Sequence, residues 1–320
     1  MEYARELAAA DLARSGITPE EAEAAGMLVC DNAKEEVYDD FKPQPALVIP
    51  YADPSSENPF EFTRGDERKP FCRVRYLSGE RPRRGFAKKK ERRYDQPKDS
   101  GLFAYFPQTE NINWPEVLDD PEVPITITEG EKKALVGCLA GVPTIGLGGV
   151  FNYATRSGDL LPELASIKWR GRSVYICFDS DAADNPNIQA AEGRLATELS
   201  VKRRADVFVA RLPKLPGQDK TGLDDLYVAK GADAVLSALE AAPRMNTVDA
   251  AVLGLNASVA WVEKDGLIYE FETGEWMQKH HFIKGSKYSA LKVIVPVLKG
   301  SDGTKTISVA NAFLTHPFRS

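Results

Sequence analysis

Two short acidic motifs constrain this chain more than any other feature, because each directly follows an apolar, β-branched run. Glu129 follows one such run, and Asp179 and Asp181 follow another. These runs predict buried parallel strands, and the residues between them predict a helix over 131–139 that ends before Gly141. A strand, helix, strand unit of this kind takes a right-handed crossover, and open α/β sheets place their sites at the carboxyl ends of the strands. We therefore expect the three carboxylates to meet at one edge of a mainly parallel sheet.

Carboxylates gathered in this way repel one another, and a hard divalent cation with oxygen ligands is the usual remedy. Mg²⁺ keeps several waters and takes phosphate oxygens as its other partners, so this is first a metal and phosphate motif. The alternative is that an acidic residue after a strand caps a helix, and that Asp-x-Asp arises by chance. Two motifs in this order favour the metal site, with Glu129, Asp179 and Asp181 as ligands.

A third polar cluster follows the strand predicted over 205–212. A loop rich in proline and glycine brings Lys220, and then Asp224 and Asp225 at the start of a helix. Lys220 could neutralise a phosphate or a developing charge, while one of the two aspartates could reach a metal. The competing interpretation is that both aspartates occupy a first helical turn, which stabilises a helix by about 0.3–1 kcal/mol each through the helix dipole.

Four further residues are candidate phosphate contacts. Gly148 and Gly149 belong to a GLGG run that lacks the complete dinucleotide-binding spacing, so we expect a tight loop whose backbone amides reach phosphate. Lys132 and Lys133 lie in the predicted helix just after Glu129 and complete this set of cofactor-binding candidates.

The stretch from 64 to 98 is strongly basic and is interleaved with aromatic residues. Such a segment suits a nucleic-acid backbone, because cations attract phosphates and aromatic rings stack on bases. The alternative is a solvated loop with a charge run. Alternation in the strand predicted over 71–77 puts Arg73 and Arg75 on one face. The nucleic-acid-binding candidates are Arg73, Arg75, Arg84, Lys88, Lys89, Lys90, Arg92 and Arg93.

The composition indicates a globular protein of 320 residues, with 43% hydrophobic residues and a formal net charge of −6. No apolar run approaches the roughly 20 residues of a membrane span, and the N-terminus lacks the features of a signal peptide, so we expect no membrane association and a cytoplasmic location. The 4 cysteines have no Cys-x-x-Cys spacing, which favours neither a zinc site nor a disulfide.

Three domains are expected: a basic α+β subdomain over 1–120, a catalytic domain over 121–243 and a small β-rich module over 244–320. The first opens with two short helices, the second of them starting at Thr18 with a capping box. The last contains a hairpin around Asp265-Gly266 and strands over 291–298 and 306–310, and the chain stops at FLTHPFRS without a helix terminus or cap. The abrupt end is typical of a segment cut from a longer protein.

The motifs TEGEKKA, FDSD and KTGLDD resemble the three motifs of the TOPRIM fold. More closely, ITEGEKKAL, IGLGGV, ICFDSDAADNPNIQAA and KTGLDDLYVAKGA resemble the DUF3854-like, TOPRIM-like domains found in replication proteins of phages and plasmids, often ahead of a helicase. The resemblance covers about residues 10–240. The residues after it are similar to linkers before helicase modules.

This resemblance implies a mainly parallel sheet flanked by helices, with Mg²⁺ or Mn²⁺ as the cofactor. It implies that Glu129 is a general acid/base or a metal ligand, that Asp179 and Asp181 are metal ligands, and that Asp224 or Asp225 is a supporting acid. Two features depart from the family. The cysteines cannot form the zinc-binding domain usual in bacterial-type primases, and the common Lys-Asp of the third motif is replaced by Asp219-Lys220.

The function that the sequence favours is a primase-like nucleotidyltransferase of a phage or plasmid replication protein. The expected partners are a single-stranded DNA template, nucleotide triphosphates and a helicase module on the C-terminal side. A metal-dependent nuclease with the same carboxylates is one alternative. A non-catalytic scaffold that binds DNA for a helicase is the other.

Overall fold

The computed structural model describes residues 2–56, 58–77, 93–256, 258–262, 264–296 and 304–316, and the side chains of 247, 294–296 and 304–305 are not among the parts described. The chain divides into two compact units. One comprises Met1–Asp119, Thr126–Ile167 and Thr221–Ser237, and the other comprises Asp120–Ile125, Lys168–Lys220 and Ala238–Ser320.

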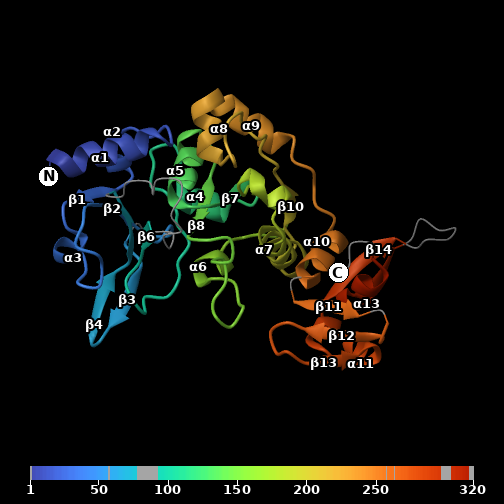
Figure 1. Ribbon diagram of the computed structural model, residues 1–320. Coiled ribbons are helices and arrows are strands. Elements are labelled where there is room, and N and C mark those ends of the chain that lie inside the picture. Colours follow the sequence, from blue (N-terminus) through green and yellow to red (C-terminus); the bar gives the residue numbers. More distant parts are fainter. Residues whose placement is uncertain are drawn as a thin grey trace. The chain divides into compact units, whose positions relative to one another are not determined.

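The N-terminal part of the first unit is a mixed helix and sheet structure (Figure 1). Its elements are α1 (Glu2–Ala13), α2 (Pro19–Ala24), β1 (Leu28–Cys30), α3 (Ala33–Glu36), β2 (Ala46–Pro50), β3 (Glu61–Arg64), β4 (Glu67–Pro70), β5 (Cys72–Tyr76), β6 (Tyr94–Asp95) and α4 (Trp114–Asp119). The second helix begins as predicted, because the Thr18 side chain accepts from the Glu21 N–H while the Glu21 carboxylate accepts from the Thr18 N–H.

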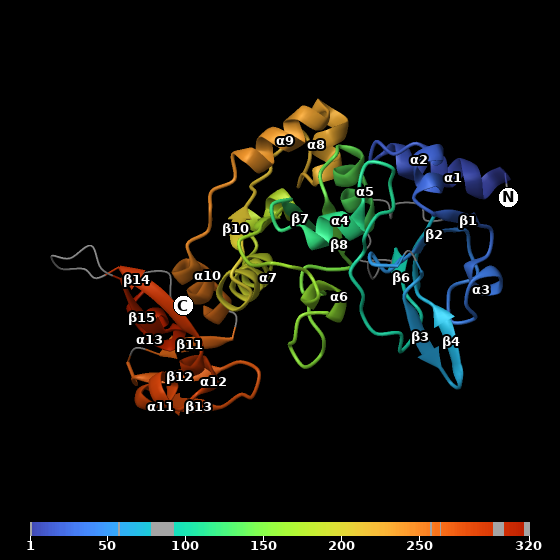
Figure 2. The ribbon, with the colours of Figure 1, turned by 180° about the vertical axis from the view of Figure 1, so that it is seen from behind.

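Two antiparallel arrangements make up the strands of this region. The strands β1, β2, β5 and β6 form one sheet in the order β1-β2-β5-β6, and β3 and β4 form a hairpin (Figure 2). Apolar side chains such as Val48 and Val74, which lie opposite each other in β2 and β5, enter the core under one face. The other face carries Arg73 and Arg75, so the predicted alternation is confirmed.

The motif-bearing segment consists of strands that alternate with helices. Its elements are β7 (Ile125–Glu129), α5 (Glu131–Leu139), β8 (Thr144–Leu147), α6 (Pro162–Ala165), β9 (Ser173–Ile176), the 3₁₀ turn η1 (Ser180–Ala183), α7 (Pro186–Thr197), the π-helical turn η2 (Glu198–Lys202), β10 (Asp206–Val209), α8 (Leu223–Lys230) and α9 (Ala232–Glu240). The strands β7 and β8 are parallel, as are β9 and β10, and the sheet has the order β10-β9-β7-β8. The predicted α/β class with a parallel sheet is confirmed.

The C-terminal part of the second unit combines strands with several helices. Its elements are α10 (Thr247–Asn256), β11 (Val259–Val262), β12 (Leu267–Glu270), β13 (Trp276–Gln278), α11 (Lys279–Lys284), α12 (Lys287–Ala290), β14 (Lys292–Pro296), β15 (Thr304–Ser308) and α13 (Val309–Thr315). The hairpin around Asp265-Gly266 forms as predicted between β11 and β12. Its core includes Ile268, Phe282 and Phe313, which are fully buried.

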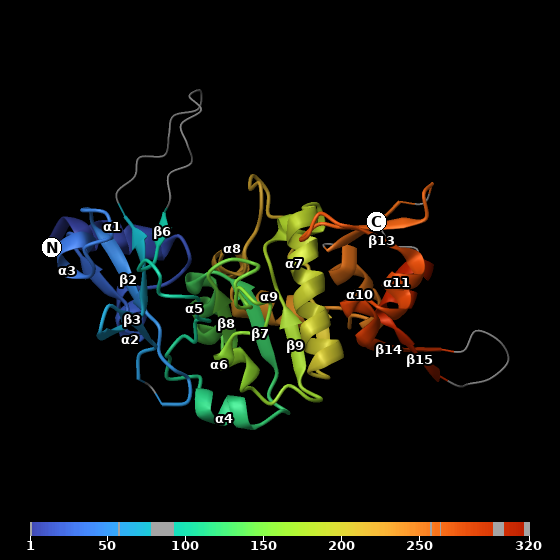
Figure 3. The ribbon, with the colours of Figure 1, turned by 90° about the horizontal axis from the view of Figure 1, so that it is seen from below.

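Two expectations are corrected here: the strand over 306–310, and the lack of a helix terminus or cap near the end of the chain, where α13 ends at Thr315 with His316 as its C-cap. The strand β15 ends at Ser308, and α13 begins at the next residue because the Ser308 hydroxyl accepts from the Asn311 N–H at 3.2 Å. Helix α10 lies along α7, as Figure 3 shows, and Thr197 Oγ1 lies 2.7 Å from the Ala250 carbonyl oxygen.

No helix in the described part of the chain has the length and apolar character needed to cross a bilayer. Cys30, Cys72, Cys138 and Cys177 are buried free thiols.

Candidate active site

The acidic pair of the second unit follows β9, at the carboxyl end of that strand. Asp179 is the N-cap residue of η1, but its side chain makes no capping hydrogen bond to this turn, so the cap interpretation does not explain the carboxylate. Only 3% of the Asp179 side chain is exposed, whereas 34% of the Asp181 side chain is. The turn therefore holds one buried and one half-buried carboxylate side by side.

Lys220 forms ion pairs with both of these aspartates. Its Nζ is 2.7 Å from Asp179 Oδ2 and 3.9 Å from Asp181 Oδ2, and 51% of its side chain is exposed. The loop after β10 thus brings a cation to the carboxylates that follow β9, in the same unit. The role of this lysine in a shared site stays a prediction.

The donor set of this pair suits a hard divalent cation. Asp181 Oδ1 is buried and has no hydrogen-bond partner among the described residues, so an acceptor remains for a metal or a water. A carboxylate pair beside an ammonium group is an arrangement in which a divalent cation and the ammonium group compete for the same oxygen atoms. The two aspartates therefore fit Mg²⁺ or Mn²⁺ as partial ligands.

Within the described ranges, no three His, Cys, Asp or Glu side chains gather as a complete set of metal ligands. Glu129, the third predicted ligand, is half-buried at the end of β7. Gly130 follows with a φ of +98°, a backbone conformation that favours glycine, and it allows the chain to turn from β7 directly into α5.

Asp224 and Asp225 belong to the first turn of α8, in the first unit. The Asp225 carboxylate accepts from the Gly222 N–H at 2.7 Å, so this residue caps its own helix. Asp224 Oδ2 accepts from the Ser15 hydroxyl at 2.6 Å, which ties α8 to the end of α1. The helix-terminus interpretation therefore accounts for Asp225, and Asp224 makes a contact between distant parts of the chain.

A buried ionic network surrounds the start of α5. Glu131, at 1% exposure, accepts from the Tyr51 hydroxyl at 2.7 Å and from Arg73 Nη1. Burial lowers the pKa of Arg73, but the charge of Glu131 outweighs burial and raises that pKa above its usual value. A Cβ atom on Gly148 would lie 2.6 Å from Arg73 Nη1, so the absence of a side chain at Gly148 makes room for this guanidinium.

Asp11 joins a second buried ionic group. It accepts from Arg75 Nη2 at 2.6 Å and also from Arg75 Nε, while Lys132 Nζ lies 3.0 Å from Asp11 Oδ2. Burial raises the pKa of Asp11, but the hydrogen bond and charge of Arg75, together with Lys132, outweigh it and lower that pKa to about 2. The Tyr94 ring lies 4.9 Å from the Arg75 guanidinium and 5.2 Å from that of Arg73.

The candidate cofactor-binding and nucleic-acid-binding residues differ in how exposed they are. Arg73 and Arg75 are largely buried in ion pairs, as is Lys132. Lys133, Gly148 and Gly149 are half-buried, and Arg93 is exposed. The remaining nucleic-acid-binding candidates, Arg84, Lys88, Lys89, Lys90 and Arg92, lie outside the described residues.

Sequence reasoning missed Asp11, Tyr51 and Glu131 as members of this network. Asp11 is 64 residues from Arg75, and Glu131 is 58 residues from Arg73. Local periodicity carries no information on such distant pairs. Only the charge of Glu131 at the start of a helix could have drawn attention to it, and that position is usual for an exposed acidic residue.

Comparison with known families gives a match over the motif-bearing segment. Residues 113–234 match a family model described as Domain of unknown function (DUF3854), which confirms the resemblance inferred from the motifs. An uncharacterized protein of Picosynechococcus sp. (strain ATCC 27264 / PCC 7002 / PR-6) is 33% identical over 189 residues, which is 50% of this chain and 19% of that protein. The chain thus spans about a fifth of the length of this relative.

Solved structures similar to this chain include primase domains. The E. coli primase catalytic core is 15% identical with a TM-score of 0.48, and the match covers 79% of this chain and 77% of that one. The zinc-binding and RNA polymerase domains of the Aquifex aeolicus primase are 14% identical with a TM-score of 0.47, and the match covers 75% of this chain and 56% of that one.

Proposed function

We propose that the chain is a primase-like nucleotidyltransferase, which joins nucleotides on a single-stranded DNA template within a phage or plasmid replication protein. The observation that carries this proposal is the contact of Lys220 with Asp179 and Asp181 at the carboxyl end of β9. A carboxylate pair for a divalent cation, next to a lysine for phosphate, is the donor set that triphosphate chemistry needs. The DUF3854 match over the same segment supports it.

Each residue of this group has a chemical role in the proposal. Mg²⁺ or Mn²⁺ would be held by Asp179 and Asp181, with Glu129 as a third ligand or as the general acid/base, and the cation would supply positive charge for the attacking and leaving oxygens. Lys220, on its loop, would bind the triphosphate and neutralise charge that develops there. Asp224 is proposed as a supporting acid, as the resemblance of the third motif implies.

The basic stretch would hold the template. Arg73 and Arg75 are buried in ion pairs, and this favours a positioning role for them. Phosphate contact is therefore proposed for the exposed Arg93 and for Arg84, Lys88, Lys89, Lys90 and Arg92. A helicase module on the C-terminal side is proposed as a partner, because unwinding of duplex DNA would supply the single-stranded template.

The test is to incubate the chain with single-stranded DNA, nucleotide triphosphates and Mg²⁺ or Mn²⁺, and to determine the sizes of all labelled strands. New short strands that depend on both the template and the metal are the expected product. Shortened template strands would replace the proposal with a metal-dependent nuclease. DNA binding without either product, under both metals, would favour a scaffold.

A further inference from the structure

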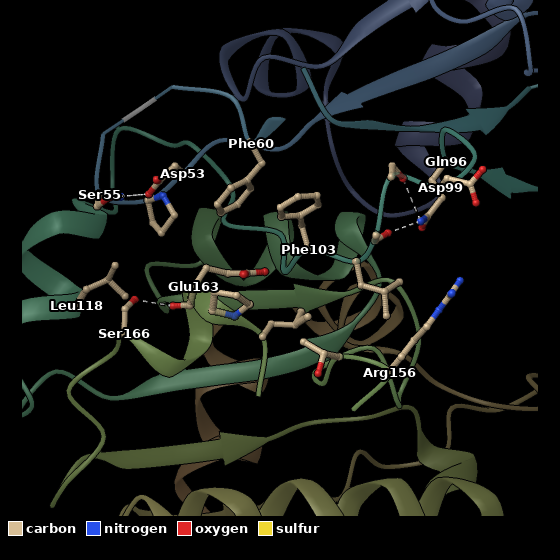
Figure 4. A pocket seen from close by; sticks show the side chains of 17 residues that line it. Asp53, Ser55, Phe60, Gln96, Asp99, Phe103, Leu118, Arg156, Glu163 and Ser166 are labelled. Carbon is tan, nitrogen blue, oxygen red and sulfur yellow. Dashed lines mark hydrogen bonds between the residues drawn. The ribbon is translucent and has the colours of Figure 1, made fainter. Parts of the chain in front are cut away.

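The first unit contains a pocket of about 1080 Å³ whose lining includes none of the residues assigned to the candidate active site (Figure 4). Three segments form it: the loop after β2, the stretch from the end of β6 into α4, and α6 with the loop that leads into it. Ligand pockets in proteins commonly measure about 300–1,000 Å³, so this one is large enough for a small organic molecule.

One wall of the pocket is aromatic. The rings of Phe60 and Phe103 stack with their centroids 4.8 Å apart and their planes 20° apart, and both side chains are half-buried. Phe103 also packs on the buried Phe71 at 4.7 Å, which fixes the pair against the core. Figure 4 shows both rings on the same side of the pocket, so they form an apolar, aromatic wall.

The charged groups that line the pocket are mostly acidic. Asp53, Asp99 and Glu163 bring three carboxylates, and Arg156 brings one cation. Arg156 is exposed and forms no ion pair within the described ranges. Because the negative charges outnumber the positive one, the pocket disfavours phosphates and other anions.

Glu163 is a half-buried carboxylate of this pocket. Its Oε1 accepts from the Ala104 N–H at 2.6 Å, and the described residues offer it no ion pair. Burial raises the pKa of Glu163, and the nearby charge of Asp53 raises it further. A half-buried carboxylate that lacks a cation gains more from a cationic ligand than an exposed one does.

We propose that this pocket binds an organic cation, a guanidinium or ammonium group on an apolar or flat body. Glu163 receives the charged group, and Phe60 and Phe103 contact the cation and its apolar part. Aromatic faces attract such cations, and the attraction is strongest where water is excluded. A free polyamine and the arginine side chain of a peptide carry this same chemistry.

The experiment is calorimetric titration of the full 320-residue chain with matched probes. N-acetylarginine methylamide should bind at least about tenfold more tightly than N-acetylcitrulline methylamide, which has nearly the same shape without the charge. Spermidine distinguishes the two sources of the cation. Tighter binding of spermidine indicates a free polyamine, and tighter binding of the arginine probe indicates a peptide.

Three variants test the residues of the pocket. Glu163→Gln keeps an oxygen for the Ala104 N–H but should weaken cation binding about tenfold, whereas Glu110→Gln, at an exposed site outside the pocket, should leave it unchanged. Arg156→Ala should strengthen cation binding, since it removes a like charge. Thermal unfolding of each variant establishes that it is folded.

Binding of the citrulline probe as tight as that of the arginine probe would overturn the proposal, because it would show an apolar pocket only. A lack of binding by both cations would overturn it as well. If the wild type binds nucleotide anions and Arg156→Ala binds them more weakly, the pocket would be assigned to an anion instead. None of these outcomes depends on primer synthesis, so this proposal and the proposed function are tested separately.

Discussion

The ammonium group of Lys220 lies 2.7 Å from Asp179 Oδ2, so a side chain of the protein itself neutralises the most buried carboxylate of the candidate active site. The contact joins the loop after β10 to the turn after β9. We expect this contact to stabilise the metal-free protein and to reduce the stabilisation that a bound metal adds.

Lys220→Met should destabilise the second unit by about 1–3 kcal/mol without metal, because Asp179 is left buried without its cation. Mg²⁺ or Mn²⁺ should then raise the unfolding temperature of Lys220→Met more than that of the wild type, since the metal no longer competes with the ammonium group. Thermal unfolding with and without metal measures both effects. Lys214→Met, at an exposed position of the same loop, is the matched control. Equal metal effects in wild type and Lys220→Met would contradict this account.

The buried group of Asp11, Arg75 and Lys132 should contribute strongly to the stability of the first unit. Asp11→Ala leaves two buried cations without their partner, and loss of one member of a buried pair costs about 3–5 kcal/mol. Arg14, whose side chain is 65% exposed and whose Nη1 lies 3.9 Å from Asp11, provides the control, because Arg14→Ala should change the free energy of unfolding by about 0–1 kcal/mol. Denaturant unfolding of both variants gives the comparison.

The same group predicts a pH dependence. The pKa of Asp11 is lowered to about 2 in the folded chain, below its ordinary value of 3.8, so the folded state binds the proton less tightly than the unfolded state does. Its stabilising contribution is therefore complete above about pH 4 and is lost as the pH falls toward 2. Asp11→Asn should remove this part of the acid dependence, measured as the free energy of unfolding between pH 5 and about 2. An unchanged slope would show that Asp11 is not the group responsible.

Much of the fold could be predicted from the sequence because its signals are local. The capping box at Thr18, the alternation of Arg73 and Arg75 and the apolar runs before Glu129 and Asp179 all act over a few residues. The sequence also placed Lys220 at the same sheet edge as Asp179, because both follow strands whose carboxyl ends share that edge, but it did not predict their direct contact.

Ion pairs between residues far apart in the sequence could not be predicted from such local signals. Asp11 meets Arg75, and Glu131 meets Arg73, only because α1, β5 and α5 pack together. The aromatic wall of the pocket and Glu163 come from three separate segments. The start of α13 was missed because Val309 and Ala310 continue the apolar pattern of the preceding strand, and the cap at Ser308 ends that strand.

The close packing of α7 against α10 depends on two glycines, Gly193 in α7 and Gly254 in α10. A Cβ atom on Gly193 would lie 2.8 Å from Leu253 Cβ and 2.9 Å from the Gly254 nitrogen. Gly193→Ala should therefore destabilise the second unit by about 1–3 kcal/mol, although alanine is the better helix former by about 1 kcal/mol. Asn187→Ala, at an exposed position of α7, should be neutral or stabilising. A stabilising Gly193→Ala in denaturant unfolding would show that the two helices can move apart without cost.

The basic stretch should determine the salt dependence of DNA binding. Replacement of Lys88, Lys89 and Lys90 with alanine should weaken binding to single-stranded DNA and flatten the slope of log K against log salt, by about 0.7 for each phosphate that the chain no longer neutralises. Fluorescence anisotropy at several salt concentrations measures this slope. Glu91→Gln, which removes a neighbouring negative charge, should not flatten it. A slope unchanged by the triple substitution would indicate a solvated loop.

Asp179 and Asp181 are proposed to serve catalysis and not DNA binding. The most direct measurement compares primer synthesis and DNA affinity in the wild type and in the variant with Asp179→Asn and Asp181→Asn. Amides keep the shape of the turn but lose the charge that holds a hard cation, so primer synthesis should fall below detection while DNA affinity stays within about twofold. Primer synthesis that persists in the double variant at the wild-type rate would contradict the account.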